Sequence, residues 1–145
     1  MTPREYLELV CIPNLDDFIQ HPTSFRHAWA ATVSLFHFRD YLAADRLEPV
    51  GAIASEIERD FPPFKAVADI ANASKHFTLD RGTRLGLSAT NLKIGRGAAF
   101  SDGSYYSDGT SHSDAPDVVR VEFNGEYIDV LHLCRSYLTV LKMKV

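Results

Sequence analysis

The chain has 145 residues, of which 46% are hydrophobic and 11% aromatic, and its formal net charge is −4. This size and composition predict one globular domain, and no window approaches the roughly 20 apolar residues of a membrane span. The negative charge argues against non-specific binding to nucleic acid, which needs clustered Lys and Arg, although it leaves room for a local basic patch.

The two cysteines and the first ten residues indicate the compartment. Cys11 and Cys134 lie far apart and form no CxxC pair. They therefore predict two buried thiols in a reducing cytosol, rather than a disulfide framework or a thiolate zinc site. Residues 1–10 also lack the basic start and the continuous apolar run of a signal peptide, so we expect a cytoplasmic protein.

The first predicted helix begins at the N-terminus. Residues 2–5 (TPRE) have the form of a helix start, with Thr2 as the cap and Glu5 in the position that a capping box requires. The residue before a proline avoids the helical conformation. Pro13 therefore predicts that this helix is short, and residues 16–22 are expected to form a connector.

The longest uninterrupted helical pattern runs from Thr23 to Asp45, without Gly or Pro. At about 100° per residue, its apolar side chains form two stripes separated by narrow polar seams. The first stripe contains Phe25, Trp29, Val33, Phe36 and Ala43, and the second contains Ala28, Ala31, Leu35, Phe38 and Leu42. An ordinary surface helix has one apolar stripe. Two stripes therefore predict a central helix that its neighbours cover from both sides.

Two further helices are predicted between Pro49 and Gly82. The apolar residues that recur at helical spacing in the first of them are Val50, Ile53, Ile57 and Phe61. The pair Pro62-Pro63 ends this helix and opens the next one, over residues 64–77. Its alanine content allows close approach to the central helix, and residues 80–82 are expected to end it.

After Gly82 the hydrophobic period changes to that of strands. Apolar residues alternate over residues 85–89 and then, in the opposite phase, over residues 92–94, which predicts a bulge or turn near Thr90. A third alternating segment covers residues 119–123.

The pair Asn124-Gly125 follows the third alternating segment and predicts a type I′ hairpin. In this turn Val121 would lie opposite Ile128. Asp129 is predicted to cap a last helix with a broad apolar face.

Residues 95–116 join two of the predicted strands and are too long and too polar for a compact turn. Loops of this length are usually functional or mobile, and we expect a mobile connector. The Tyr105-Tyr106 pair has interface character, because Tyr offers contact area at low entropic cost. Three aspartates recur every six residues, but the spacing of an EF-hand is absent, which disfavours calcium.

Together these elements predict an α+β fold in a single domain, residues 1–145. Three to five helices form a mainly helical core around the central helix, with a small antiparallel sheet of two or three strands at one edge. The helical part covers residues 1–80, the sheet with its loop residues 83–129, and the closing helix residues 129–144. So small a sheet does not stand alone, and it must pack on the helices or pair across a dimer. A two-fold homodimer is favoured, since this is the commonest oligomer.

The strongest candidate site lies on the helix over residues 64–77. Asp69, Asn72 and His76 are spaced by three and four residues and so share one face. His37 and Asp40 are three residues apart on the central helix. If the two helices meet there, two histidines and two carboxylates converge. A carboxylate that fixes the tautomer of a histidine suits general acid–base chemistry. The alternative interpretations are a buried His–Asp bond that only fixes helix register, and ligand binding.

No cofactor is predicted. The six histidines form no HxxxH, HExxH or HxH pattern, so a metal site is conceivable only as a set of His37, Asp40, Asp69 and His76. Residues 95–97 do not match a phosphate-binding loop, and no GxSxG element indicates a nucleophile.

The segment ADIANASKHFTL (residues 68–79), preceded by a Trp-containing helix that ends in FRDYL, resembles a group of small helical proteins with an Asp-x-x-Asn-Ala-x-Lys-His helix. More distantly, about the first 80 residues are similar to HEPN-type helical domains, many of which are metal-independent RNA-cutting toxins or defence proteins. The HEPN signature has an Arg that is followed by a His after four to six intervening residues. Here the corresponding positions hold Asp69, Ile70 and Ala71, so the resemblance carries over only His76 and implies a scaffold.

Two functions follow as expectations. The first is a binding or regulatory module that acts on a protein or small-molecule partner through the sheet edge and the Tyr105-Tyr106 pair. His37, Asp40 and Lys75 are further candidate binding residues. The alternative is a HEPN-like metal-independent ribonuclease or another hydrolase, with His76 as acid or base, positioned by Asn72, Asp69 and Lys75. Whether the chain is an enzyme stays open at this point.

Overall fold

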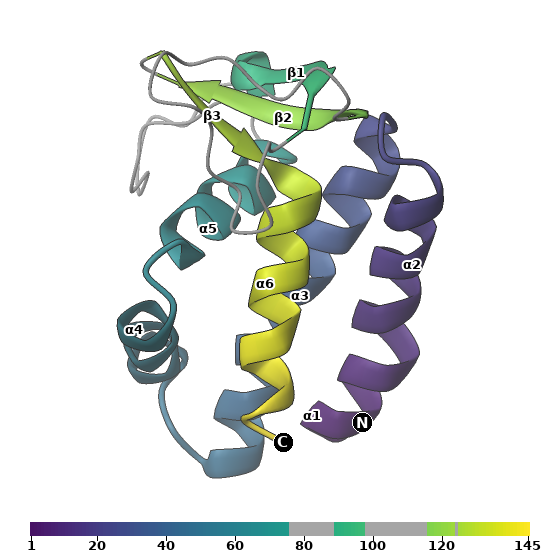
Figure 1. Ribbon diagram of the computed structural model, residues 1–145. Coiled ribbons are helices and arrows are strands. Elements are labelled where there is room, and N and C mark those ends of the chain that lie inside the picture. The colour runs from purple at the N-terminus through teal and green to yellow at the C-terminus, as the bar shows by residue number, and fades with distance from the viewer. Residues whose placement is uncertain (76–88, 98–115, 124) are drawn as a thin grey trace.

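The computed structural model describes residues 1–75, 89–97, 116–123 and 125–145. The helices form a bundle, and a three-stranded antiparallel sheet lies across one end of it (Figure 1). The predicted α+β fold, with a mainly helical core and a small antiparallel sheet, is confirmed. In the described part of the chain, no helix has both the length and the apolar character that crossing a membrane requires.

The N-terminal residues form one helical rod of three successive segments. These are α1 (Pro3–Tyr6), the π-helical turn η1 (Leu7–Cys11) and α2 (Ile12–Gln20). The predicted capping box is present at its start. The Glu5 N–H donates to Thr2 Oγ1 at 3.2 Å, and the Thr2 N–H donates to Glu5 Oε2 at 2.8 Å.

The prediction that Pro13 ends this rod is wrong. Pro13 lies in the first turn of α2, directly after the π-helical turn. There the Ile12 N–H donates to the carbonyl of Leu7, five residues back. A widened turn accommodates a proline ring that would collide with the carbonyl four residues back in a regular α-helix. Residues 16–20 therefore belong to α2, and the connector to the next helix is only residues 21–24.

Helix α3 (Phe25–Arg46) is the predicted central helix, capped by Ser24, and it contacts all the other α-helices in the described part of the chain. All five residues of its second apolar stripe are buried. The first stripe is divided: Phe36 and Ala43 are buried, whereas Trp29 and Val33 are half-buried and Phe25 is 37% exposed. Neighbours therefore cover α3 on two sides as predicted, and one side of its N-terminal half is partly open.

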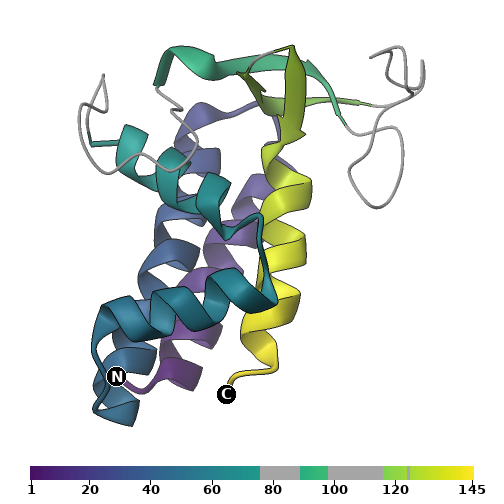
Figure 2. The same cartoon turned by 90° about the vertical axis from the view of Figure 1, so that its left-hand side faces the viewer.

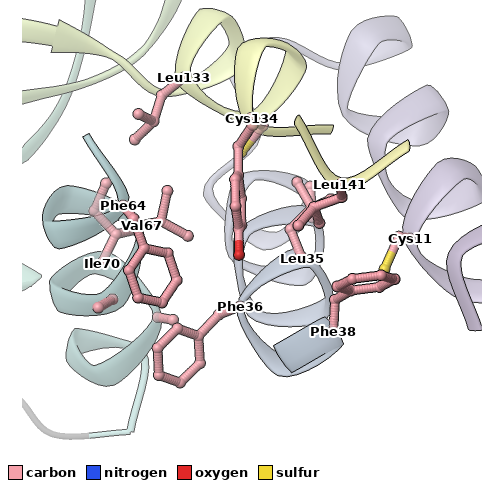
Figure 3. Packing of buried hydrophobic residues seen from close by; sticks show 14 of the residues in the cluster. Cys11, Leu35, Phe36, Phe38, Phe64, Val67, Ile70, Leu133, Cys134 and Leu141 are labelled. Atoms are coloured by element: carbon pink, nitrogen blue, oxygen red, sulfur yellow. The ribbon is translucent and has the colours of Figure 1, made fainter. Parts of the chain in front are cut away.

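Three more helices complete the core: α4 (Val50–Asp60), α5 (Phe64–Ala73) and α6 (Val130–Lys142). Figure 2 shows α4 and α5 crossing the same side of the bundle. Phe64, at the start of α5, faces Phe36 of α3 with ring centroids 6.0 Å apart (Figure 3), and its ring lies 5.6 Å from that of Tyr137 on α6. The predicted continuation of α5 to Phe77 and its end at residues 80–82 lie outside the described residues.

The sheet consists of β1 (Leu92–Arg96), β2 (Asp117–Phe123) and β3 (Glu126–Asp129), in the order β1-β2-β3. The short 3₁₀ turn η2 (Ala89–Asn91) precedes β1, in agreement with the turn predicted near Thr90. Val121 lies opposite Ile128, as the hairpin prediction requires, and Gly125 has a φ of +78°.

The connector predicted over residues 95–116 is partly strand. β1 extends through Arg96, and β2 begins at Asp117. The Gly97 N–H donates to the Pro116 carbonyl at 2.9 Å. β1 therefore extends into the predicted loop by two residues, Gly95 and Arg96, whereas β2 begins directly after that loop. Residues 98–115 lie outside the described part.

Helix α6 begins at the predicted cap, since Asp129 Oδ1 accepts a hydrogen bond from the His132 N–H at 2.9 Å. Its face toward the bundle is buried and comprises Val130, Leu133, Cys134, Tyr137 and Leu141. The sheet also bonds directly to the helical part, because the Val119 N–H donates to the Pro22 carbonyl at 2.8 Å.

Two glycines offer a matched test of the hairpin. An added Cβ meets no atom within 4 Å at either Gly51 or Gly125, so only backbone conformation separates them. Gly125→Ala places a side chain at positive φ and is expected to lower the free energy of unfolding by about 1–2 kcal/mol. Gly51→Ala, in α4, is expected to raise it by about 0.5 kcal/mol. Urea unfolding measures both, and equal shifts of the two variants would contradict the predicted turn geometry.

The C-terminal residues are held to α4 by an ion-pair network. Lys144 Nζ lies 2.6 Å from Glu56 Oε1 and 2.8 Å from Asp60 Oδ2, and Arg46 Nη1 lies 2.9 Å from Glu56 Oε2. The Lys144 ammonium lowers the pKa of both carboxyl groups. Carboxylates with lowered pKa values stabilise the folded state when the pH is above their ordinary pKa of about 4. This contribution is lost as the pH falls through the lowered values.

Replacing Lys144 with Met is therefore expected to lower the urea midpoint near neutral pH, and the difference from the native chain should narrow toward about pH 3. Lys142→Met is the matched control, because Lys142 is exposed in the last turn of α6. Urea titrations at several pH values measure both. A difference that stays constant with pH would show that Lys144 acts through packing rather than through charge.

Candidate functional site

The structure brings together two of the predicted site residues, His37 and Asp40. They lie one turn apart on α3, with His37 Nδ1 2.6 Å from Asp40 Oδ2. Their side chains are 34% and 40% exposed. An ionised carboxylate only accepts hydrogen bonds, so Nδ1 donates to Asp40 and Nε2 is the ring nitrogen left for a partner. Nε of the Arg39 guanidinium lies 3.7 Å from Asp40 Oδ1.

The His37–Asp40 pair continues a row of half-buried side chains. Trp29, Val33, His37 and Asp40 follow one another at spacings of four, four and three residues and are all half-buried. Such spacings place side chains on one side of a helix. We call these four residues the α3 strip. It combines apolar contact area at one end with a hydrogen-bonding pair at the other.

Aromatic contacts hold the helix around this strip. The Phe36 ring packs edge-on against His37 at 5.3 Å, and the Tyr6 and Tyr41 rings stack at 3.8 Å. The Tyr6 hydroxyl donates to the Ser34 carbonyl at 3.1 Å. Burial raises the pKa of Tyr6 well above its ordinary value, so this hydroxyl stays protonated and acts as a structural donor.

The predicted residues on α5 have very different surroundings. Asp69 is completely buried, Asn72 is half-buried and Lys75 is exposed. Lys75 donates its backbone N–H to the Asn72 carbonyl at 3.0 Å, in the turn that follows α5. These three residues therefore share a segment of chain without sharing a solvent-accessible surface.

The other predicted site residues, His76, Tyr105 and Tyr106, lie outside the described part of the chain. The meeting of His37 and His76 consequently stays a prediction. Within the described ranges, no three His, Cys, Asp or Glu side chains gather in a way that could hold a metal ion. This applies to His37, Asp40 and Asp69, the three described members of the metal set considered above.

Both cysteines are buried thiols, as predicted. Burial raises the pKa of Cys11 and of Cys134 to about 12. Because the thiolate is the nucleophilic form, neither sulfur is poised for covalent catalysis. Cys11 Sγ lies 3.5 Å from the Ser34 carbonyl, and Cys134 Sγ lies 3.4 Å from Thr32 Oγ1, so both thiols link α3 to its neighbours.

The sheet carries an arginine that sequence reasoning did not single out. Arg120 points away from the buried face, and its guanidinium lies 4.3 Å from the Tyr127 ring and 2.8 Å from Glu122 Oε1. A Cβ at Gly95 would collide with it, so the missing side chain makes room for it. The register between β1 and β2, which the sequence pattern did not specify, creates this arrangement. Ile94, 51% exposed on β1, is the large apolar residue that stays open on the described sheet.

A second missed cluster lies where α2 meets α3. The His21 and His27 rings stack at 4.6 Å, and Arg26 Nη2 lies 2.9 Å from His27 Nε2. The sequence signal was three basic side chains within seven residues around Pro22. The positions of these side chains in the sequence match no helical spacing and no known motif. The stack depends instead on the fold of the connector.

Comparison of the chain with protein-family models, curated proteins and solved structures finds no match. The resemblance of about the first 80 residues to HEPN-type domains therefore stays an expectation.

Proposed function

We propose that the protein is a binding or regulatory module without catalytic activity, and that the α3 strip is part of its recognition surface. The observation that carries this proposal is the His37–Asp40 pair, which is held at 2.6 Å and is more than one-third exposed. It adjoins the half-buried Trp29 and Val33. Interfaces concentrate aromatic side chains of this kind beside a few oriented polar groups.

The burial of Asp69 supports the same proposal. In the ribonuclease alternative, Asp69 helps to position His76 for an RNA substrate. A completely buried carboxylate fits better with a role inside the bundle, because charge buried in a protein interior needs internal partners. Burial also keeps the thiols of Cys11 and Cys134 protonated, so neither of them offers a nucleophile.

The strip indicates the chemistry of its partner. Trp29 and Val33 suit an apolar side chain, and Nε2 of His37 offers a hydrogen-bonding group to a polar one. A protein surface can present an apolar side chain and a polar group side by side. The net charge of −4, by contrast, disfavours a polyanion as the partner. The protein partner is therefore our first choice, with Tyr105 and Tyr106 as further contact residues in this proposal.

Site-specific photocrosslinking tests the proposal. A photoreactive residue is introduced at Val33 and, as the matched control, at the exposed Arg135 on α6. In an extract of the source cells, we expect one discrete adduct from position 33 and none from position 135. The adduct should disappear in His37→Ala and Asp40→Asn backgrounds that unfold at unchanged urea midpoints.

A nuclease assay tests the ribonuclease alternative. Single-stranded RNA is incubated with the native chain in the presence of a chelator, and with the His76→Ala variant. Cleavage by the native chain that is lost in a fully folded His76→Ala variant would overturn the proposal and support the metal-independent ribonuclease. An adduct that survives the loss of His37 and of Asp40 would show that the α3 strip is not the recognition surface.

A further inference from the structure

The short connector between α2 and α3 joins the helical bundle to the sheet. It lies at the sheet end of the bundle (Figure 1). His21 ends α2 by donating its backbone N–H to Asp17, and the Ser24 N–H returns to the His21 carbonyl at 3.0 Å. Between them, the Pro22 carbonyl accepts the Val119 N–H at 2.8 Å. The central strand β2 is thus bonded to a connector of four residues.

Three basic side chains lie in this connector or in the first turn of α3 that follows it. The His21 and His27 rings are nearly parallel, with centroids 4.6 Å apart. Arg26 Nη2 lies 2.9 Å from His27 Nε2. A guanidinium can only donate, so His27 Nε2 must accept, and its hydrogen is on Nδ1. That Nδ1 is buried and has no hydrogen-bond partner among the described residues. The observed contact therefore requires a neutral His27.

The charges around His27 oppose its protonation. Desolvation of the ring lowers its pKa, and the Arg26 guanidinium and His21 lower it further. The Asp17 carboxylate on α2 acts in the opposite direction but more weakly. From the sheet, the connector meets the uncharged backbone of Val119. A cation in the first turn of α3 is also unfavourable, because a helix N-terminus carries positive partial charge.

We propose that His21, Arg26 and His27 form a proton-sensitive clamp that keeps the α2–α3 connector bonded to β2 at neutral pH and lets this bond open on acidification. When His27 takes up a proton, Nε2 becomes a donor that faces another donor, and the bond to Arg26 is lost. The new charge then lies beside Arg26 and against the stacked His21 ring. The connector moves to separate these charges, and the Pro22–Val119 hydrogen bond opens. This regulation is independent of the recognition surface proposed on α3.

The direction of the pH dependence follows from linkage. A histidine whose folded-state pKa is lowered takes up its proton more readily in the opened or unfolded chain. The stabilising contribution of neutral His27 is fully present when the pH is above the ordinary histidine pKa of about 6.5. It is lost as the pH falls through the lower value of the closed clamp.

Amide hydrogen exchange followed by NMR tests the clamp in the full chain. We compare the protection factors of the Val119 and Leu35 amides at about pH 7.5 and about pH 5. Leu35, buried in α3, is the internal reference. The protection of Val119 is expected to fall several-fold at the lower pH, while that of Leu35 is unchanged. Equal protection of Val119 at both pH values would overturn the proposal.

Three variants locate the titrating group. His27→Gln keeps an acceptor for Arg26 but does not titrate, and should abolish the pH dependence of Val119 protection. His132→Gln, on α6, is the matched control and should retain it. Arg26→Gln removes a charge that lowers the pKa of His27, so the transition should move to higher pH, a shift that a purely structural role would not produce. A pH dependence that survives His27→Gln, or an unmoved midpoint in Arg26→Gln, would contradict the clamp.

Discussion

Replacing Phe64 with Ala is expected to lower the free energy of unfolding by about 3–5 kcal/mol. Phe64 is completely buried and joins three helices, because its ring lies against Phe36 of α3 and Tyr137 of α6. Truncation leaves a cavity between rings that are fixed by their own helices, so the core is unable to close around it.

Urea unfolding followed by circular dichroism measures this loss. Leu9→Ala is the control, since Leu9 is 66% exposed, and its effect should stay within about 0.5 kcal/mol. Phe64→Leu should recover much of the stability by refilling the space. An effect of Phe64→Ala no larger than that of Leu9→Ala would show that α5 does not pack on α3 and α6 as described.

A chain that ends at Asp129 is expected not to fold cooperatively. It loses all of α6, whose face toward the bundle includes five buried residues. Removing them exposes α3, α2 and the inner face of β2, all of which contact α6. Each buried residue of this size contributes about 1.5–3 kcal/mol through burial, so the loss from five of them is as large as the whole stability of a usual domain, about 5–15 kcal/mol.

The control for this truncation is a chain that ends at Lys142. It keeps α6 complete and lacks Lys144, so it should fold with the lowered stability expected for Lys144→Met. Near-ultraviolet circular dichroism and amide dispersion in NMR spectra report cooperative folding. A sharp unfolding transition of the chain that ends at Asp129 would mean that the remaining helices form a core of their own.

Much of the fold was predictable because its signals are local. Two apolar stripes without Gly or Pro identified α3, and Asn124-Gly125 set the register of Val121 opposite Ile128. Asp129 stands directly before an apolar helical pattern and caps it. The exception was Pro13, where the local rule predicts an end. The rod continues there because packing on α3 outweighs it and the π-helical turn makes room for the ring.

The candidate site was predictable only within one helix. His37 and Asp40 meet because a spacing of three residues guarantees proximity on α3. The burial of Asp69 was not predictable, since the sequence pattern does not state which side of α5 faces its neighbours. The His21–His27 stack escaped detection for a similar reason. It forms across a bend between two helices, where no periodicity relates the two side chains.

The π-helical turn affects the phase of the whole N-terminal rod. Leu7, Cys11 and Leu15 are buried at successive steps of four residues. In a regular α-helix, two such steps overshoot two full revolutions by about 80°, whereas seven residues fall only about 20° short. The step from Leu7 to Leu15 thus covers eight residues, one more than the seven that bring a regular α-helix back to nearly the same face after two turns. The wide turn absorbs this surplus by winding less per residue, and Leu9 is the side chain that it turns outward.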